Sequence, residues 1–344
     1  MFRQGFLLLT ALLLSAAPAH GSDRIPRPVL DANFADPTVT VHGNGFVGFS
    51  TGSLIPRSYA DGPAGAWRPA ASALVKLPSW SHADGDIWAS DIARVGRWWV
   101  LYFAAPVRGL GEYGRCIGVA RSRSATSGFK PVGGKPLVCP PYADTPVGAT
   151  PAAEDPVPVA LPGLPRAGVI DPSLVLAEGR PHLIYKTDRV PSSIRLLPLS
   201  ASGLHAAGPS VELFRHDGVL ENPVLIERPA GWVMLLSQGD FTRCSYRTVW
   251  RRSTSILNWS EATSGVLLDQ TSRLCGPGGA DVTPMPHSRR LRVYFHAWTC
   301  RGATTPCGPG IRKDKLRHRA RAIRPMYAAE LDWVDGAPVV AGFL

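Results

Sequence analysis

The fold is decided by the stretch GVLENPVLIE at residues 218–227 together with GWVMLLS at residues 231–237. Glu221 stands just before a short apolar run, a turn containing Pro229 and Gly231 follows, and a second run rich in β-forming residues comes after the turn. Two apolar runs of this length that are joined by a Pro/Gly turn are typical of a β-hairpin. The stretch therefore predicts a hairpin that carries a carboxylate near the start of its first strand.

The same unit recurs along the chain, and each copy has an acid roughly ten residues before its second apolar strand. The five acids are Asp36, Asp91, Asp171, Glu221 and Asp281. A unit that repeats at intervals of about 50 to 80 residues indicates a radial repeat architecture. Because every unit is made of strands with Gly/Pro turns, the sequence predicts an all-β fold, a five-bladed β-propeller. Equivalent acids of successive blades are expected to meet at one central mouth.

The first 22 residues have the composition of an export signal. A basic start at residues 1–4 is followed by an apolar run from Phe6 to Leu14 and by small residues up to Ser22. The run is too short for a confident membrane span, although an anchor that stays attached is the alternative. We expect a signal peptide at 1–22 and a secreted or periplasmic mature chain that has no contact with a membrane.

Residues 23–344 are expected to form one propeller domain, because a repeat fold of this length counts as a single domain. Proline recurs throughout residues 140–168, where the hydrophobic periodicity is lost, so we expect an inserted loop there. The formal net charge is +11 at pH 7, and much of the excess lies at residues 312–321. A solvated basic loop explains this stretch better than attraction to acidic polymers. No nucleic-acid-binding motif accompanies it, and we expect a monomer.

Six cysteines remain after export, and an even number in an oxidising compartment indicates up to three disulfides. Pairing between neighbours in the sequence is our expectation, because each pair then lies within one blade or loop. The expected pairs are Cys116–Cys139, Cys244–Cys275 and Cys300–Cys307.

The clustered acids point to chemistry on sugars. Cleavage of a glycosidic bond needs one carboxylic acid to protonate the leaving oxygen and one carboxylate to activate water. Like charges at one mouth raise the pKa of at least one carboxyl, which can keep it protonated near neutral pH. Capping of turns is the alternative role for any single acid. Asp91, Trp80 and Trp88 are expected to contact substrate, since an indole ring is a flat apolar plate for a sugar face; core packing is the alternative for Trp80.

Several motifs, in order along the chain, resemble those of glycoside hydrolase family 43. They are FADP at 34–37, IWASDI at 87–92, VIDPS at 169–173, LENP at 220–223, GPG at 276–278 and LDWVDGAP at 331–338. The resemblance implies a five-bladed propeller and, most often, an inverting arabinanase, arabinofuranosidase or xylosidase. It also implies that Asp36 is the general base, that Glu221 is the general acid, and that Asp171 orients Glu221 and tunes its pKa.

The chain departs from the family pattern at three positions. Ser90 stands where proline is common, Asn222 follows the glutamate where glycine is common, and Gly279 stands where a histidine often follows Gly-Pro-Gly. The resemblance implies that the neighbourhood of that histidine can hold a calcium ion, and His296 is our candidate ligand. A histidine satisfied in the core is the alternative, and we expect that no cofactor is required.

These observations together predict a secreted glycoside hydrolase that cleaves arabinofuranosyl or xylosyl linkages in polysaccharides or oligosaccharides with inversion. One alternative is a related propeller enzyme with the same acids and a different sugar, such as a fructoside or a phosphorolysed mannoside. The other alternative is a propeller that binds carbohydrate without cleaving it.

Overall fold

The computed structural model describes residues 25–63, 65–110, 113–140, 167–300, 307 and 322–344. The expected signal peptide, nearly all of the proline-rich insert and the basic stretch at 312–321 lie outside the described residues. Within these described ranges, no helix is long and apolar enough to cross a membrane.

The described chain forms five four-stranded antiparallel sheets, each built from four consecutive strands. Blade 1 contains β1 (Thr38–His42), β2 (Gly45–Phe49), β3 (Arg57–Ala60) and β4 (Arg68–Ala70). Blade 2 contains β5 (Trp88–Val95), β6 (Trp98–Pro106), β7 (Arg115–Ser122) and β8 (Lys130–Pro131). Blade 3 contains β9 (Val169–Ala177), β10 (Arg180–Thr187), β11 (Ser192–Pro198) and β12 (Val211–His216). Blade 4 contains β13 (Leu220–Arg228), β14 (Gly231–Gln238), β15 (Arg247–Ser253) and β16 (Thr263–Leu268). Blade 5 contains β17 (Gly278–Pro284), β18 (Leu291–His296), β19 (Met326–Val334) and β20 (Ala337–Phe343).

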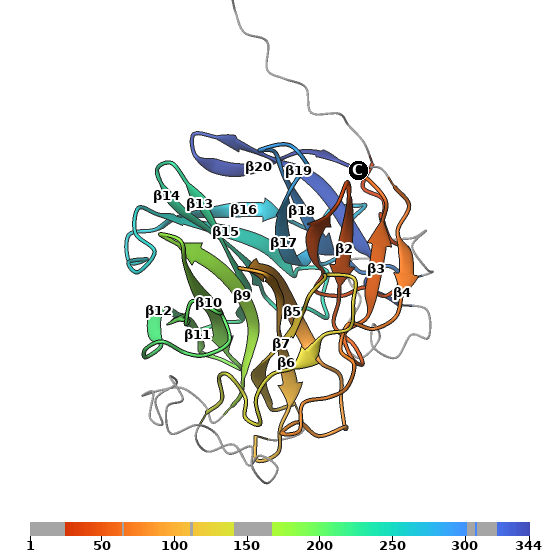
Figure 1. Ribbon diagram of the computed structural model, residues 1–344. Helices are drawn as coiled ribbons and strands as arrows, with labels where there is room; N and C mark the ends of the chain where they lie inside the picture. Colours follow the sequence, from red (N-terminus) through yellow and green to blue (C-terminus); the bar gives the residue numbers. More distant parts are fainter. Residues whose placement is uncertain (1–24, 64, 111–112, 141–166, 301–306, 308–321) are drawn as a thin grey trace, which may run out of the picture.

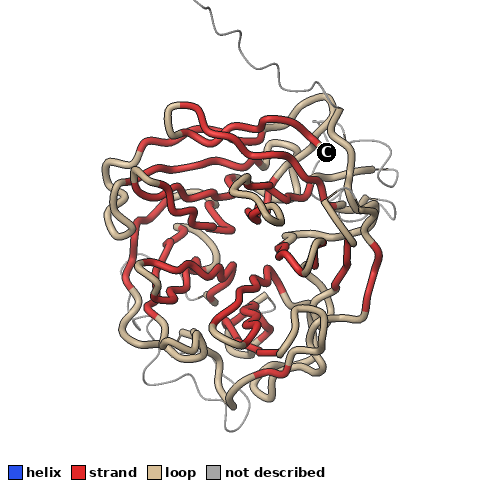
Figure 2. Tube along the Cα trace, turned by 45° about the horizontal axis from the view of Figure 1, so that its top comes forward, coloured by secondary structure: helices blue, strands red, loops and turns tan. Residues whose placement is uncertain are grey.

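The blades stand around a common centre, with the first strand of each blade innermost (Figures 1 and 2). The predicted five-bladed propeller is therefore confirmed. The hairpin predicted from residues 218–237 is also confirmed, because β13 pairs with β14 in antiparallel register. Second strands are packed on both faces by neighbouring blades, so they read as unbroken apolar runs. Met234, Leu235 and Leu236 of β14 are at most 1% exposed.

The ring is closed by contacts between the two ends of the described chain. Val29 and Leu30 donate backbone hydrogen bonds to the carbonyl of Met326 in β19, and Phe34 donates to the carbonyl of Arg324. The three expected disulfides are all present, so the neighbour pairing is confirmed.

The same backbone irregularity occurs at the start of every inner strand. One residue has a positive φ of 36° to 58°, and we call it the bulge residue of its blade: Asp36, Ala89, Asp171, Asn222 and Gly279. In blades 2 to 5 this residue and the next one face a single residue of the second strand, which is a β-bulge. Bulges re-aim side chains and are frequent beside active sites.

The bulges correct one expectation. The five acids do not share one register: Asp36 and Asp171 are bulge residues, Glu221 precedes a bulge, and Asp91 and Asp281 lie two residues beyond one. The number of residues between an acid and the second strand therefore does not fix the level of that acid along the propeller axis, because the turns differ in length between blades.

Candidate active site

The propeller axis holds one cavity to which all five inner strands contribute. Each strand contributes its bulge residue and the two residues that follow it: Asp36, Pro37, Thr38, Ala89, Ser90, Asp91, Asp171, Pro172, Ser173, Asn222, Pro223, Val224, Gly279, Ala280 and Asp281. Glu221 directly precedes the blade 4 residues, and its side chain is 16% exposed. The side chain of Asp36 is equally exposed, at 16%. The two carboxyls with predicted acid and base roles are thus both largely buried, with a small part of each side chain exposed.

Second strands supply a polar side chain at the level of the bulge. Lys186, Ser237 and His296 lie opposite the residues that precede the bulges of blades 3, 4 and 5. Thr51 has the corresponding place in blade 1, because its amide donates to the carbonyl of Ala35. These four residues lie on the second strands or directly after them, behind the inner-strand residues that line the cavity.

The amide of a bulge residue donates to the polar side chain of the preceding blade. Ala89 N donates to Thr51 Oγ1 at 3.0 Å, and Gly279 N donates to Ser237 Oγ at 2.8 Å. Asp36 N donates to His296 Nδ1 of blade 5 at 3.1 Å. Lys186 is a donor only, and Asn222 N instead donates to Asp171 Oδ2 at 3.0 Å. This contact places the Asp171 carboxyl beside blade 4.

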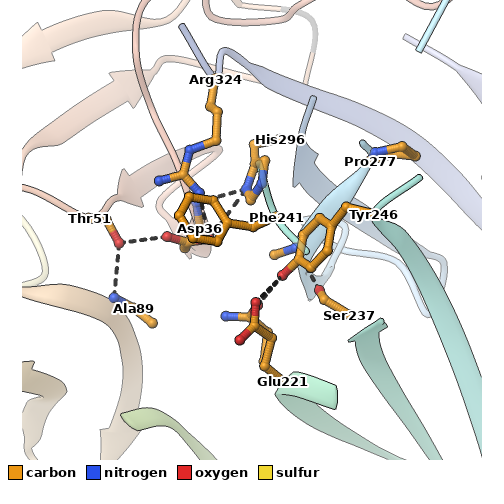
Figure 3. A network of polar contacts seen from close by, with 12 residues as sticks. Asp36, Thr51, Ala89, Glu221, Ser237, Phe241, Tyr246, Pro277, His296 and Arg324 are labelled. Atoms are coloured by element: carbon orange, nitrogen blue, oxygen red, sulfur yellow. Dashed lines mark hydrogen bonds and ion pairs between the residues drawn. The ribbon is translucent and has the colours of Figure 1, made fainter. Parts of the chain in front are cut away.

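Asp36 is held as an ionised carboxylate (Figure 3). Thr51 Oγ1 donates to its Oδ2 at 2.7 Å, and Arg324 Nη1 lies 3.5 Å from its Oδ1. Burial alone raises the pKa of Asp36, but the charges of Arg324 and His296 and the Thr51 hydrogen bond outweigh it and lower this pKa below its usual value. Arg324 supplies the charge at neutral pH, since the imidazole is uncharged there.

His296 is a neutral, fully buried imidazole. Its Nδ1 accepts the Asp36 amide hydrogen, so the ring proton is on Nε2. Burial and the nearby Arg324 charge lower the pKa of His296 to about 3. Gly279 is required beside it, because a Cβ at 279 stands 2.7 Å from His296 Nδ1 and 2.8 Å from Asp36 Oδ1. Glycine at position 279, where the family often has histidine, thus leaves space for the His296 side chain from β18.

The residues around His296 do not fit the expected calcium site. Its Nδ1 lone pair is used by the Asp36 amide and its Nε2 carries the proton, so no lone pair is left for a metal. No group of three His, Cys, Asp or Glu side chains suited to a metal ion occurs within the described ranges, whereas calcium takes six to eight oxygen ligands. We assign no step to a metal; His296 is a buried histidine whose Nε2 has no hydrogen-bond partner among the described residues.

Asp171, Glu221 and Lys186 form a second charged group. Lys186 is 1% exposed, and its Nζ lies 3.4 Å from Glu221 Oε2. Burial and the Glu221 charge raise the pKa of Asp171 to about 8, against the opposing effects of Lys186 and the Asn222 amide. Asp171 therefore holds a proton near neutral pH, beside the Glu221 carboxyl and the Lys186 ammonium.

The Tyr246 hydroxyl points toward the Glu221 carboxyl (Figure 3). Its hydroxyl is 2.8 Å from Glu221 Oε1 and 3.0 Å from Asn222 Oδ1. Its ring stacks on His296 with centroids 6.0 Å apart. Burial and the Glu221 charge raise the pKa of Tyr246 well above its usual value, so the phenol is protonated and can donate.

Asp91 and Asp281 lie beyond the bulges and join blades. Thr38 Oγ1 is 3.1 Å from Asp91 Oδ1 and 3.0 Å from Asp281 Oδ2. The amide of Leu174 donates to Asp91 Oδ2 at 2.6 Å, and that of Val39 donates to Asp281 Oδ2 at 2.8 Å. Both oxygens of Asp91 thus accept hydrogen bonds, and Asp91 also lines the cavity; its contact with substrate stays a prediction. Burial and the Asp281 charge raise the pKa of Asp91 to about 7.

The two tryptophans expected to contact sugar differ. Trp80 is 1% exposed inside a core cluster with Phe103 and Ile87, so the structure corrects the expectation to core packing. Trp88 is half-buried; the Arg115 guanidinium lies 3.2 Å from its ring centroid, and the Tyr113 ring stacks on it at 6.3 Å. Contact between Trp88 and substrate stays a prediction.

Sequence analysis missed Thr51, Lys186, Tyr246 and Arg324. For the first two a signal exists: a polar residue ends an apolar second strand in FST at 49–51 and IYK at 184–186, as it also does in LLS at 235–237 and YFH at 294–296. Tyr246 and Arg324 come from segments outside the strands, and only the folded chain brings them to the acids.

No family model matches the chain. The chain is 33% identical over 133 residues to the Probable arabinan endo-1,5-alpha-L-arabinosidase A of Aspergillus flavus, and equally so to that of Aspergillus oryzae. That match covers 37% of this chain and 40% of the relative, so the chain spans about two fifths of the length of the curated relatives it matches.

Solved structures match over most of the chain. A thermostable family-43 glycoside hydrolase superposes with a TM-score of 0.66 at 18% identity, over 90% of this chain and 92% of that one. Cellvibrio cellulosa alpha-L-arabinanase in complex with arabinohexaose superposes with a TM-score of 0.62 at 17% identity, over 90% and 95% of the two chains. The chain therefore has the five-bladed propeller fold that is found in family 43 glycoside hydrolases and alpha-L-arabinanases.

Proposed function

We propose that this protein is a glycoside hydrolase that cleaves arabinofuranosyl or xylosyl linkages in polysaccharides with inversion, and that arabinan is its first substrate to test. One observation carries the proposal: an ionised Asp36 and a protonated Asp171 line one axial cavity in different electrostatic settings, and Glu221 directly precedes the cavity residue Asn222. The sequence identity to the arabinosidases and the fold shared with family 43 hydrolases support it.

Each carboxyl has a role that follows from its contacts. Asp36, kept ionised by Arg324 and Thr51, takes a proton from water as the water oxygen bonds to the anomeric carbon. The bond from that carbon to the leaving oxygen breaks, and Glu221 gives this oxygen its proton. Asp171 accepts the amide hydrogen of Asn222, the residue next to Glu221, and we assign it the role of orienting Glu221.

Glu221→Gln tests the acid. Because an amide has no proton to give, turnover of arabinan should fall by about 10²- to 10⁴-fold. An aryl arabinofuranoside whose leaving group needs no proton should lose much less. Asp36→Asn should reduce turnover of both substrates. Circular dichroism checks that the fold is kept, and NMR of the first product should show the opposite anomeric configuration.

Unchanged turnover of arabinan by the Glu221→Gln variant would refute the assignment of the acid. If the wild-type protein binds arabinan oligosaccharides in calorimetry but yields no product over long incubation, the protein is a carbohydrate-binding propeller. Products from another glycoside in a substrate panel would move the proposal to that sugar.

We also propose that the protein is exported, since three disulfides in one chain suit an oxidising compartment. Expressed with residues 1–22 in a bacterium, the protein should appear outside the cytoplasm with a mature start near residue 23 in mass spectrometry. A full-length, reduced protein in the cytoplasm would contradict this proposal.

A further inference from the structure

The Tyr246 hydroxyl has one hydrogen and two carboxyl or amide oxygens within reach. Glu221 Oε1 is 2.8 Å away and Asn222 Oδ1 is 3.0 Å away. A phenol donates one hydrogen bond and can accept others. The hydroxyl hydrogen therefore points to one of these two oxygens at a time, and the protonation of Glu221 decides which.

We propose that Asn222 is a positioning residue for the acid: its Oδ1 receives the Tyr246 hydrogen when Glu221 is protonated, so that Tyr246 can accept the proton of Glu221. The inference rests on the proposed function, because it concerns the acid of that reaction. With Glu221 ionised, Tyr246 donates to Oε1. With Glu221 protonated, Oε1–H donates to the phenol oxygen and the phenol donates to Asn222.

The surroundings of Glu221 favour Oε1 as the protonated oxygen. Oε2 lies 3.4 Å from the Lys186 ammonium, and an oxygen beside a cation is the one that stays unprotonated. Asp36 from blade 1 adds negative charge, as does Asp171 from β9 when it is ionised. His296 stacks on Tyr246 as a neutral ring, and the Ser237 hydroxyl also hydrogen-bonds the phenol oxygen.

The backbone explains why position 222 can carry this amide. Asn222 has a φ of 50°, a region that glycine adopts freely and that asparagine tolerates better than most residues. Glycine is common here in the family that the sequence resembles. Asparagine thus keeps the bulge and adds a hydrogen-bond acceptor. Asn222→Gly removes that acceptor without straining the backbone at this positive φ.

The sign of the effect follows from the two states. Asn222→Gly removes the acceptor needed only when Glu221 is protonated, so it destabilises that form and lowers the pKa of Glu221. Losing one such hydrogen bond corresponds to a downward shift of about half a unit to one unit. Asn222→Asp keeps an acceptor and adds a negative charge, so the pKa should rise instead.

The experiment measures the pKa of Glu221 in two ways on the full-length mature protein. The basic limb of the pH profile of kcat/KM for arabinan reports it through activity. Infrared titration of the protonated carboxyl band that Glu221→Gln abolishes reports it without activity. The variants are Asn222→Gly, Asn222→Asp, Tyr246→Phe and the double variant Asn222→Gly/Tyr246→Phe, with Asn44→Gly in the exposed β1–β2 turn as control.

Asn222→Gly should move both readouts down, and Asn222→Asp should move them up. In the Tyr246→Phe background Asn222→Gly should cause no further shift, because the phenol connects the two residues. An unshifted pKa in Asn222→Gly, or the same shift with and without Tyr246, would overturn the inference. If the wild-type protein has no hydrolase activity the proposed function fails, while the infrared titration still decides whether Asn222 acts on Glu221.

Discussion

Two layers of carboxyls along the propeller axis have opposite characters, although they come from the same inner strands. At the bulges, Asp36 and Glu221 are each contacted by a cation, Arg324 and Lys186 respectively. Two residues beyond the bulges, Asp91 and Asp281 have no ion pair with a cation among the described residues; instead they accept hydrogen bonds from Thr38 and from backbone amides.

The difference teaches that a shift of two residues along a bulged strand changes the role of a carboxyl. A strand rises about 3.3 Å per residue, so the second layer lies beyond the reach of the second-strand side chains that surround the bulges. There the carboxyls bind amides of the next blade, Leu174 for Asp91 and Val39 for Asp281. The first layer is suited to proton transfer and the second to closing the ring.

The largest expected effect separates the two layers by activity. Asp36→Asn should lower kcat for arabinan by about 10³-fold, since it removes the base. Asp91→Asn should change kcat by no more than about two-fold, because an amide can accept from Leu174 and donate to Thr38. Steady-state kinetics on both variants checks this, and an equal loss in the two variants would put the second layer into the reaction.

Lys186→Met should raise the pKa of Asp171. The Lys186 charge lowers the pKa of Asp171, so removing it raises the basic limb of the kcat/KM profile by about one unit or more. The exposed Lys130 of β8 provides the control, Lys130→Met, which should leave the profile unchanged. A downward shift in Lys186→Met would mean that Lys186 does not act through its charge.

Asp91→Asn should make the protein more stable in alkaline solution. The pKa of Asp91 is raised to about 7 in the folded protein, so its stabilising contribution is complete below about pH 4 and is lost as the pH rises through 7. The variant should match the wild type near pH 4 and exceed it at pH 8 by about 4 kcal/mol, because the shift from 3.8 to about 7 corresponds to about three pKa units. Denaturant unfolding at both pH values measures this. Asp84→Asn, at a side chain that is 96% exposed, should show no such difference. Lower stability of Asp91→Asn than of the wild type at pH 8 would contradict the raised pKa of Asp91.

Thr51→Val should have the smallest effect on activity among the substitutions near Asp36. It removes the 2.7 Å hydrogen bond to Asp36 and the acceptor of the Ala89 amide. We expect kcat to fall a few-fold, the acidic limb of the profile to rise by about half a unit, and stability to fall by about 1–2 kcal/mol. Thr51→Ser keeps the hydroxyl and should restore all three; loss of activity in both variants would point to packing instead.

The sequence predicted what depends on near neighbours in the chain. Apolar runs joined by Gly/Pro turns gave the hairpins, their repetition gave five blades, and the short separations between cysteines gave the disulfide pairing that the structure has. The buried place of Trp80 was not evident, because an indole between turn residues fits a cleft and a core equally well.

The chemistry of the cavity was decided by tertiary structure. Asp36 receives Arg324 and His296 from more than 250 residues away in the sequence, and Glu221 receives Lys186 from the preceding blade. The sequence by itself determined the strands, the turns and the presence of the acids, because these follow from local periodicity and backbone preference. Only closure of the ring decided which cation, amide or phenol each acid meets, because a carboxyl's pKa depends on groups within a few ångströms that other blades supply.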